Sequence, residues 1–184
     1  MAHRDTSPIV RCSVWIPVAG PALDKVQHVI HVVHRRGGGP GFHPHLTLLS
    51  GAETTQADAE LKLKHLALQV RPFEIKLGRV EWRNEYFRCL YVSAAMSEAL
   101  AAARRAAYEV FEMNPPPPYE PHVSLLYGNL DEALKKELAQ EAGGSVDVAF
   151  EAAGVQLVNA SPSVPVTAWR TLAERPLSTQ ALGA

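Results

Sequence analysis

The sequence predicts an α+β fold built from two similar lobes. Two ten-residue stretches are similar to each other, 42–51 (FHPHLTLLSG) and 119–128 (YEPHVSLLYG). Each copy lies in a half that contains a helix, a motif strand, another helix and a pair of strands, which indicates an internal duplication. Strands joined by hairpins and interleaved with helices favour antiparallel sheets. We therefore expect each lobe to be an antiparallel sheet with helices on its outer face, and a groove between the two sheets.

The elements of the first half are expected at 9–18, 23–36, 45–50, about 56–70, 73–82 and 86–93. Residues 9–18 are rich in β-formers and end near Pro17 and Gly20, which is typical of a strand. The next segment has apolar residues at helical intervals and stops at the glycines 37–39. The first motif is the following strand, a helix comes next, and the last two segments form a hairpin that turns at 83–85.

The elements of the second half are expected at 97–113, 122–127, 131–140, 146–158 and 164–172. An alanine-rich helix ends at the proline run 115–118, which cannot continue it. The second motif strand follows, then a short charged helix that Gly143 and Gly144 end, then two strands around a turn-rich segment. The chain is expected to be one domain over 1–184, with motif lobes at about 22–95 and 97–172, strand 9–18 completing a sheet, and a frayed tail at 176–184.

Composition excludes several classes of function. The 184 residues are 47% apolar and 20% charged, as in an ordinary globular protein. The formal net charge of −1 lacks the basic excess with which proteins bind long nucleic acid. No apolar run has the length of a membrane span, and the N-terminus lacks the apolar core of a signal peptide. We expect a cytoplasmic monomer that binds neither membranes nor long nucleic acid.

The polar residues of the repeat are a histidine and a hydroxyl two positions apart, His45 with Thr47 and His122 with Ser124. Residues i and i+2 of a strand point to the same face, so each pair forms one polar unit in an otherwise apolar run. A single histidine in a strand is more often a hydrogen-bonded core residue than a catalytic one. The recurrence of both side chains at matched positions favours a functional role instead.

Two histidines that face each other across a groove suit acid–base catalysis. A neutral imidazole accepts a proton from water, and an imidazolium donates one to a leaving oxygen. The hydroxyls of Thr47 and Ser124 can hold the non-bridging oxygens of a phosphate. A cyclic phosphodiester carries a single negative charge, so these four short side chains are sufficient for it.

These motifs resemble those of the 2H phosphoesterases, a family defined by two H-x-[T/S]-x motifs in a duplicated α+β fold. The opening S-V-W-I-P at 13–17 and the second motif with its tyrosine look most like the plant and yeast cyclic phosphodiesterases. The resemblance implies metal-independent hydrolysis of ADP-ribose 1″,2″-cyclic phosphate to ADP-ribose 1″-phosphate, and of nucleoside 2′,3′-cyclic phosphates to 2′-phosphates. The implied partner is a small cyclic phosphate, and no cofactor is implied.

The resemblance assigns roles to six positions: catalytic His45 and His122, phosphate-binding Thr47 and Ser124, and pocket-lining Tyr127 and Trp15. Alternation along a regular strand would turn Tyr127 away from Ser124. The near symmetry of the halves leaves acid and base open, and we take His122 as the residue that activates water. The pH profile of kcat/KM is expected to be bell-shaped, with both limbs in the histidine range.

Two alternatives stay open. In the first, the chain processes RNA ends or acts like a 2′-5′ ligase. Binding of an oligonucleotide would then involve several phosphate contacts and would depend steeply on salt concentration. In the second, the chain is a non-catalytic nucleotide-binding module that has lost turnover, although a pure binder has no need of two proton-transfer groups.

Other features are interpreted as structural. His28, His31 and His34 recur on the first predicted helix, but no Cys or carboxylate joins them, so no metal site is expected. Trp82 and Trp169 are expected in the core. The glycines 37–39 are read as a flexible connector. Arg83 and Arg88 are read as solvated turn charges, with contact to a second substrate phosphate as the alternative. The sequence leaves open whether Cys12 and Cys89 are bonded.

Overall fold

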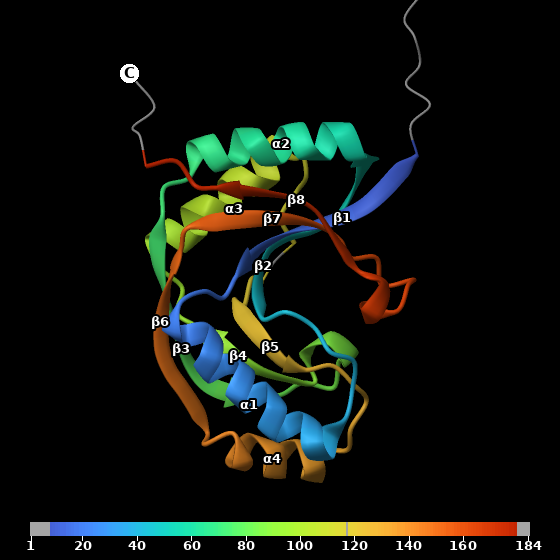
Figure 1. The fold of residues 1–184 in the computed structure, drawn as a ribbon, viewed down its shortest axis with the longest axis vertical. Helices are drawn as coiled ribbons and strands as arrows, with labels where there is room; N and C mark the ends of the chain where they lie inside the picture. Colours follow the sequence, from blue (N-terminus) through green and yellow to red (C-terminus); the bar gives the residue numbers. More distant parts are fainter. Residues whose placement is uncertain (1–7, 117, 180–184) are drawn as a thin grey trace, which may run out of the picture.

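The computed structural model describes residues 8–116 and 118–179. They form one curled sheet of eight β-strands with four α-helices (Figure 1). The strands are β1 (Ile9–Pro17), β2 (His45–Thr55), β3 (Phe73–Glu81), β4 (Leu90–Ala94), β5 (His122–Leu126), β6 (Ser145–Ala152), β7 (Gly154–Asn159) and β8 (Arg170–Pro176). The helices are α1 (Pro21–Gly37), α2 (Gln56–Gln69), α3 (Glu98–Val110) and α4 (Glu132–Glu141), with 3₁₀ turns at Tyr86–Arg88 and Val166–Ala168. The expected α+β class is confirmed.

The sheet has the order β6-β3-β4-β5-β2-β1-β7-β8, and its recorded strand pairs are antiparallel. Helices α2 and α3 lie against the β2-β1-β7-β8 part, whereas α1 lies against β5 and β6 of the other part and packs on α4 (Figure 1). Each part therefore combines elements from both halves of the chain. The predicted lobes 22–95 and 97–172 were wrong in this respect, because α1 packs with β5, β6 and α4 rather than with the first motif strand.

The two motif strands are neighbours at the centre of the sheet. They pair at one position, Leu46 with Val123, so the two expected sheets are continuous rather than separate. Each of these residues directly follows a motif histidine, and both are fully buried. Continuing this antiparallel register places His45 across from Ser124 and Thr47 across from His122. The duplication thus produces a local pseudo-twofold arrangement in which each histidine faces the other motif's hydroxyl.

Three of the four helices, α2, α3 and α4, begin at a residue whose side chain caps the helix. The hydroxyls of Thr55 and Ser97 and the carboxylate of Asp131 accept hydrogen bonds from backbone N–H groups three residues later. Such caps stabilise a helix by about 1 kcal/mol each. The apolar faces of these helices contribute fully buried leucines to the core, including Leu63, Leu100 and Leu138. No helix among residues 8–116 and 118–179 is long and apolar enough to cross a membrane.

Several predicted boundaries were wrong. The segment 146–158 is not one strand, because it is divided between Ala152 and Gly154 into β6 and β7. In the strand order, β6 lies at one edge of the sheet and β7 lies next to the strand at the other edge. The final strand begins at Arg170, after a 3₁₀ turn, rather than at 164. The tail also begins later than expected. Leu177 is buried and its N–H donates to Ala153 O, while the N–H of Ser178 donates to Ala67 O; residues 180–184 lie outside the described part.

Two of the glycines 37–39, Gly37 and Gly39, are packed against β5 and the residue after it, whereas Gly38 is open to solvent. Gly39 has a φ of 93°, and a Cβ at this position would lie 2.6 Å from the carbonyl oxygen of Tyr127. A β-carbon would therefore clash with the backbone just after β5, and L-residues rarely adopt this φ. The connector from α1 thus lies directly against the end of the second motif strand.

Candidate active site

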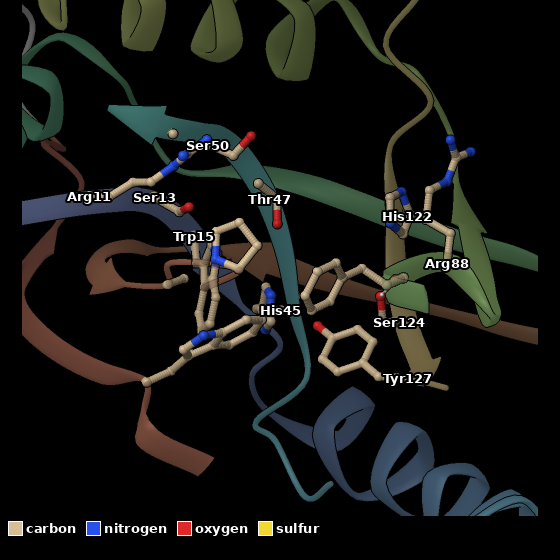
Figure 2. Close-up of a pocket in the computed structure, with 15 residues that line it drawn as sticks. Arg11, Ser13, Trp15, His45, Thr47, Ser50, Arg88, His122, Ser124 and Tyr127 are labelled. Carbon is tan, nitrogen blue, oxygen red and sulfur yellow. Dashed lines mark hydrogen bonds between the residues drawn. The ribbon is translucent and has the colours of Figure 1, made fainter. Parts of the chain in front are cut away.

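A pocket of about 360 Å³ opens over the centre of the sheet (Figure 2). All six residues singled out in the sequence line it: Trp15, His45, Thr47, His122, Ser124 and Tyr127. They come from β1, β2, β5 and the residue that follows β5. The volume is within the range of small-molecule sites. The pocket therefore contains every group needed for the chemistry that the two motifs suggest.

Both histidines are oriented in the same way. Nδ1 of His45 lies 2.7 Å from His43 O, and Nδ1 of His122 lies 2.8 Å from Glu120 O. Because a carbonyl only accepts, each Nδ1 carries the proton in the neutral ring. This leaves Nε2 of each histidine as the ring nitrogen available to a ligand.

The environment keeps both imidazoles neutral. Burial lowers the pKa of His45 to about 4, opposed by the hydrogen bond to His43 O and assisted by the nearby His122. Burial also lowers the pKa of His122, and the guanidinium of Arg88 adds to this, whereas the hydrogen bond to Glu120 O opposes it. At neutral pH the free site therefore contains two proton acceptors, and one must be protonated to serve as an acid.

Trp15 stacks on His45 with ring centroids 3.5 Å apart and an angle of 9° between the planes. The indole excludes water from one face of the imidazole, which favours the neutral form. If the ring accepts a proton, the same indole face attracts the resulting cation, an interaction worth about 1 kcal/mol. Trp15 thus holds the His45 ring in place on the wall of the pocket.

The two motif hydroxyls differ in the free protein. Ser124 Oγ donates to Phe87 O at 3.1 Å, so it must rotate to donate to a phosphate oxygen. Within the described part of the chain, no group forms a hydrogen bond with the Thr47 hydroxyl, although Thr47 O accepts one from the Tyr119 hydroxyl. The Thr47 hydroxyl is available without rearrangement.

Tyr127 lines the pocket because β5 ends at Leu126 and strand alternation no longer applies beyond it. Burial raises the pKa of its phenol, and the neighbouring Ser124 hydroxyl opposes this. The ring stacks on Phe42, the aromatic residue that precedes the first motif, with centroids 4.1 Å apart. The tyrosine is therefore a fixed, neutral group at one end of the pocket.

The sequence reasoning missed several lining residues: Arg11, Ser13, Ser50, Gly51, Phe87, Ala160, Pro162 and Trp169. Trp169 was expected in the core, but it lines the pocket because the segment before β8 folds over it, with Trp169 Nε1 donating to Ser161 O. Trp82 packs partly buried against the core, as expected. Alternation from Trp15 along β1 signals Ser13 and Arg11, and the repeat aligns Ser50 with Tyr127.

Arg88 also lines the pocket, but its guanidinium is held by the carboxylate of Glu120. It lies over the ring of Tyr91, 5.2 Å from the centroid, and Arg83 reaches the other oxygen of Glu120 at 3.5 Å. This network fixes Glu120, whose backbone carbonyl orients His122. We infer that Arg88 is a positioning residue for His122. The prediction that Arg88 is a solvated turn charge was wrong, because its side chain is 22% exposed and paired with Glu120.

The remaining candidates lie elsewhere. His28, His31 and His34 line a separate surface hollow on α1. Among the described residues, no group of three or more His, Cys, Asp or Glu is arranged to hold a metal ion. Cys12 and Cys89 are both buried and free.

Comparison with known proteins places these observations in a family. The family model of the 2′-5′ RNA ligase superfamily matches residues 20–162. A curated protein of Arabidopsis thaliana named cyclic phosphodiesterase is 24% identical over 145 residues, covering 79% of this chain and 80% of that protein.

Solved structures show the same fold. Apo LigT of E. coli has a TM-score of 0.63 at 16% identity, covering 94% of this chain and 100% of that chain. LigT complexed with 3′-AMP has a TM-score of 0.58 at 16% identity, covering 92% and 99%. A protein of Thermus thermophilus has a TM-score of 0.62 at 18% identity, covering 91% and 97%. At these identities the likeness concerns the fold alone.

Proposed function

We propose that this chain, which belongs to the 2′-5′ RNA ligase superfamily of 2H phosphoesterases, hydrolyses small cyclic phosphodiesters to monoesters by two-histidine acid–base catalysis. The family and the curated cyclic phosphodiesterase of Arabidopsis support a phosphoesterase. One observation carries the finer proposal. Both motif histidines line a single pocket, with Nδ1 of each donating to a carbonyl two residues earlier and Nε2 available to the substrate.

The reaction requires one water and two proton transfers. One imidazole takes a proton from water, whose oxygen attacks the phosphorus and forms a new P–O bond. The P–O bond to one ring oxygen breaks, and the other histidine, as imidazolium, protonates that oxygen. The hydroxyls of Thr47 and Ser124 donate to the non-bridging oxygens as charge builds on them. The product is a phosphate monoester, and the two histidines end with their protonation states exchanged.

The electrostatics favour His45 as the base and His122 as the acid, the reverse of the assignment adopted from the sequence. His45 has a pKa of about 4, so it is neutral over the whole physiological range. With His45 as base and His122 as acid, the active form has His45 neutral and His122 protonated, and this is the main form of the site between the two pKa values. With the roles exchanged, the active form would have His45 protonated and His122 neutral, which is a minor form of the site at every pH.

The leading substrate is ADP-ribose 1″,2″-cyclic phosphate, with nucleoside 2′,3′-cyclic phosphates as smaller relatives. This choice rests on the family resemblance of the motifs and on a pocket that extends beyond the histidine pair. The LigT complex with 3′-AMP, which is similar in size to a nucleoside 2′,3′-cyclic phosphate, supports the choice of a small nucleotide. Chromatography of reactions with each compound tests the proposal. We expect a monoester from at least one of them, and failure to consume either would contradict it.

The pH profile of kcat/KM is expected to be bell-shaped with an acidic optimum. Activity rises as pH increases through about 4, because His45 loses its proton and becomes a base. It falls again at a pH below 6.5, because the lowered pKa of His122 removes the proton that the acid requires. Initial rates at low substrate, measured from roughly pH 3.5 to 8.5, cover both limbs. An optimum above about pH 7 would contradict these assignments.

A further inference from the structure

We infer that Arg11, Ser13 and Ser50 form a second anion subsite, which binds a phosphate group that the substrate carries in addition to its cyclic phosphate. The inference rests on the proposed function, since it concerns the same pocket, and it narrows the substrate class. All three residues line the pocket that contains the two histidines (Figure 2).

The residues from β1 share one face of the strand. Arg11, Ser13 and Trp15 are spaced by two, and all of them line the pocket. Trp15 stacks on His45, so it lies between the catalytic pair and the other two side chains. A substrate that extends along β1 from the histidines therefore passes Trp15 before it reaches Ser13 and Arg11.

A bulge in β2 brings Ser50 to the same region. Val14 pairs with Leu49 and Cys12 pairs with Ala52, so two residues of β2, Ser50 and Gly51, lie opposite one residue of β1. Gly51 has a φ of 79°, which suits glycine at a bulge. A Cβ on Gly51 would lie 3.5 Å from Nη2 of Arg11, which shows how closely the guanidinium approaches the bulge.

The polar groups of this region are available for a ligand. Ser13 is only 4% exposed, and within residues 8–116 and 118–179 its hydroxyl forms no hydrogen bond. The hydroxyl lines the pocket and is not one of the fully buried polar atoms that lack a partner, so it is open to a ligand and can donate to an anion there. Arg11 pairs with Glu53 at 3.6 Å, but both side chains are about half exposed or more, so this ion pair is weak and exchangeable.

The two ends of the pocket differ in chemistry. Tyr127 occupies the position that matches Ser50 in the repeat, and the region around it is aromatic, with Phe87 and Trp169 nearby. The other arginine that lines the pocket, Arg88, is held by Glu120. An anionic group is therefore favoured at the Arg11 end, and an apolar or aromatic group at the Tyr127 end.

The chemistry that fits is a cyclic phosphate joined to a second phosphate by a short linker. The pyrophosphate of a nucleoside diphosphate sugar provides it, as in ADP-ribose 1″,2″-cyclic phosphate. The internal phosphodiester of an oligonucleotide that ends in a 2′,3′-cyclic phosphate would provide one negative charge, where the pyrophosphate provides two. A mononucleoside 2′,3′-cyclic phosphate has no second phosphate, so it is the matched reference substrate.

The test is a comparison of kcat/KM for ADP-ribose 1″,2″-cyclic phosphate and for 2′,3′-cyclic AMP. Arg11→Gln is expected to lower the ratio of the two values roughly 10- to 100-fold, as loss of hydrogen bonds to a charged group implies. Glu53→Gln is expected to raise the ratio, because it removes a competing anion. Arg71→Gln, a change at an exposed arginine that does not line the pocket, is the control and leaves the ratio unchanged.

A ratio in Arg11→Gln within about twofold of the wild-type ratio would overturn the subsite. A dinucleotide that ends in a 2′,3′-cyclic phosphate distinguishes the two sources of charge: a loss in Arg11→Gln that is confined to the dinucleotide assigns the subsite to RNA ends, and equal losses for both compounds show that it accepts either phosphate. If neither substrate is turned over, the proposed function fails, but the subsite is still tested by binding. Quenching of tryptophan fluorescence then gives the affinities for ADP-ribose and for AMP. The affinity for ADP-ribose relative to that for AMP must fall in Arg11→Gln for the subsite to stand.

Discussion

His45→Asn and His122→Asn each lower kcat by about 10²- to 10⁴-fold while the protein stays folded, which is the contribution of a positioned general acid or base. The asparagine amide nitrogen takes a place similar to that of Nδ1, so it can still donate to His43 O or Glu120 O. What is lost is Nε2, the atom that exchanges protons with water or with the leaving oxygen. Single-turnover rates and the thermal unfolding midpoint of each variant provide the measurement.

His65→Asn is the matched control, because it makes the same change at an exposed histidine of α2. It should leave kcat unchanged. The double variant should lose much less than the product of the two single losses, since both groups act in one step. A kcat within about tenfold of wild type in either single variant would contradict the two-histidine account.

Leu46→Ala is expected to lower the free energy of unfolding by about 2–5 kcal/mol, the usual cost of a cavity at a buried leucine. Leu46 is fully buried and forms the single strand pair that joins β2 to β5. Because the total stability of a domain is about 5–15 kcal/mol, this is a large fraction of it. The midpoint and slope of urea unfolding give the value.

Leu61→Ala on α2 is the corresponding control, with a side chain that is 51% exposed. Its effect should stay within about 0.5 kcal/mol. Equal effects of the two substitutions would show that the centre of the sheet is not the tightly packed junction described above.

The parts of the site that depend on local periodicity could be predicted from the sequence. Two identical spacings of histidine and hydroxyl in apolar runs indicated which side chains share a face, and the structure places all four around one pocket. Arg11 could have been found by alternation from Trp15, but the place of Ser50 beside β1 could not. It depends on a bulge at Gly51, and a change of register is not visible in a pattern of alternation.

The fold shows the same limit at longer range. The four predicted helices are present, because caps such as Thr55 and Asp131 and apolar spacing act within a few residues. The choice of neighbours in the sheet is a non-local property. Nothing near Ala153 indicates that β6 pairs with β3 while β7 pairs with β1, and so the exchange of elements between the two halves could not be predicted.

The asymmetry of the pocket gives the duplication a functional meaning. The central histidines and hydroxyls are repeated, whereas the flanking positions differ, with Ser50 at one end and Tyr127 at the other. A repeated centre with different ends suits a substrate that has a reactive phosphate in the middle and unlike groups on its two sides.

The most direct test is phosphorus NMR of the wild-type protein and the His122→Asn variant, each with excess EDTA and ADP-ribose 1″,2″-cyclic phosphate or 2′,3′-cyclic AMP. We expect the cyclic phosphate resonance to be replaced by a monoester resonance with the wild-type protein alone, at an unchanged rate when EDTA is omitted. Conversion that requires an added metal, or that proceeds equally in His122→Asn, would contradict metal-free catalysis by the two histidines.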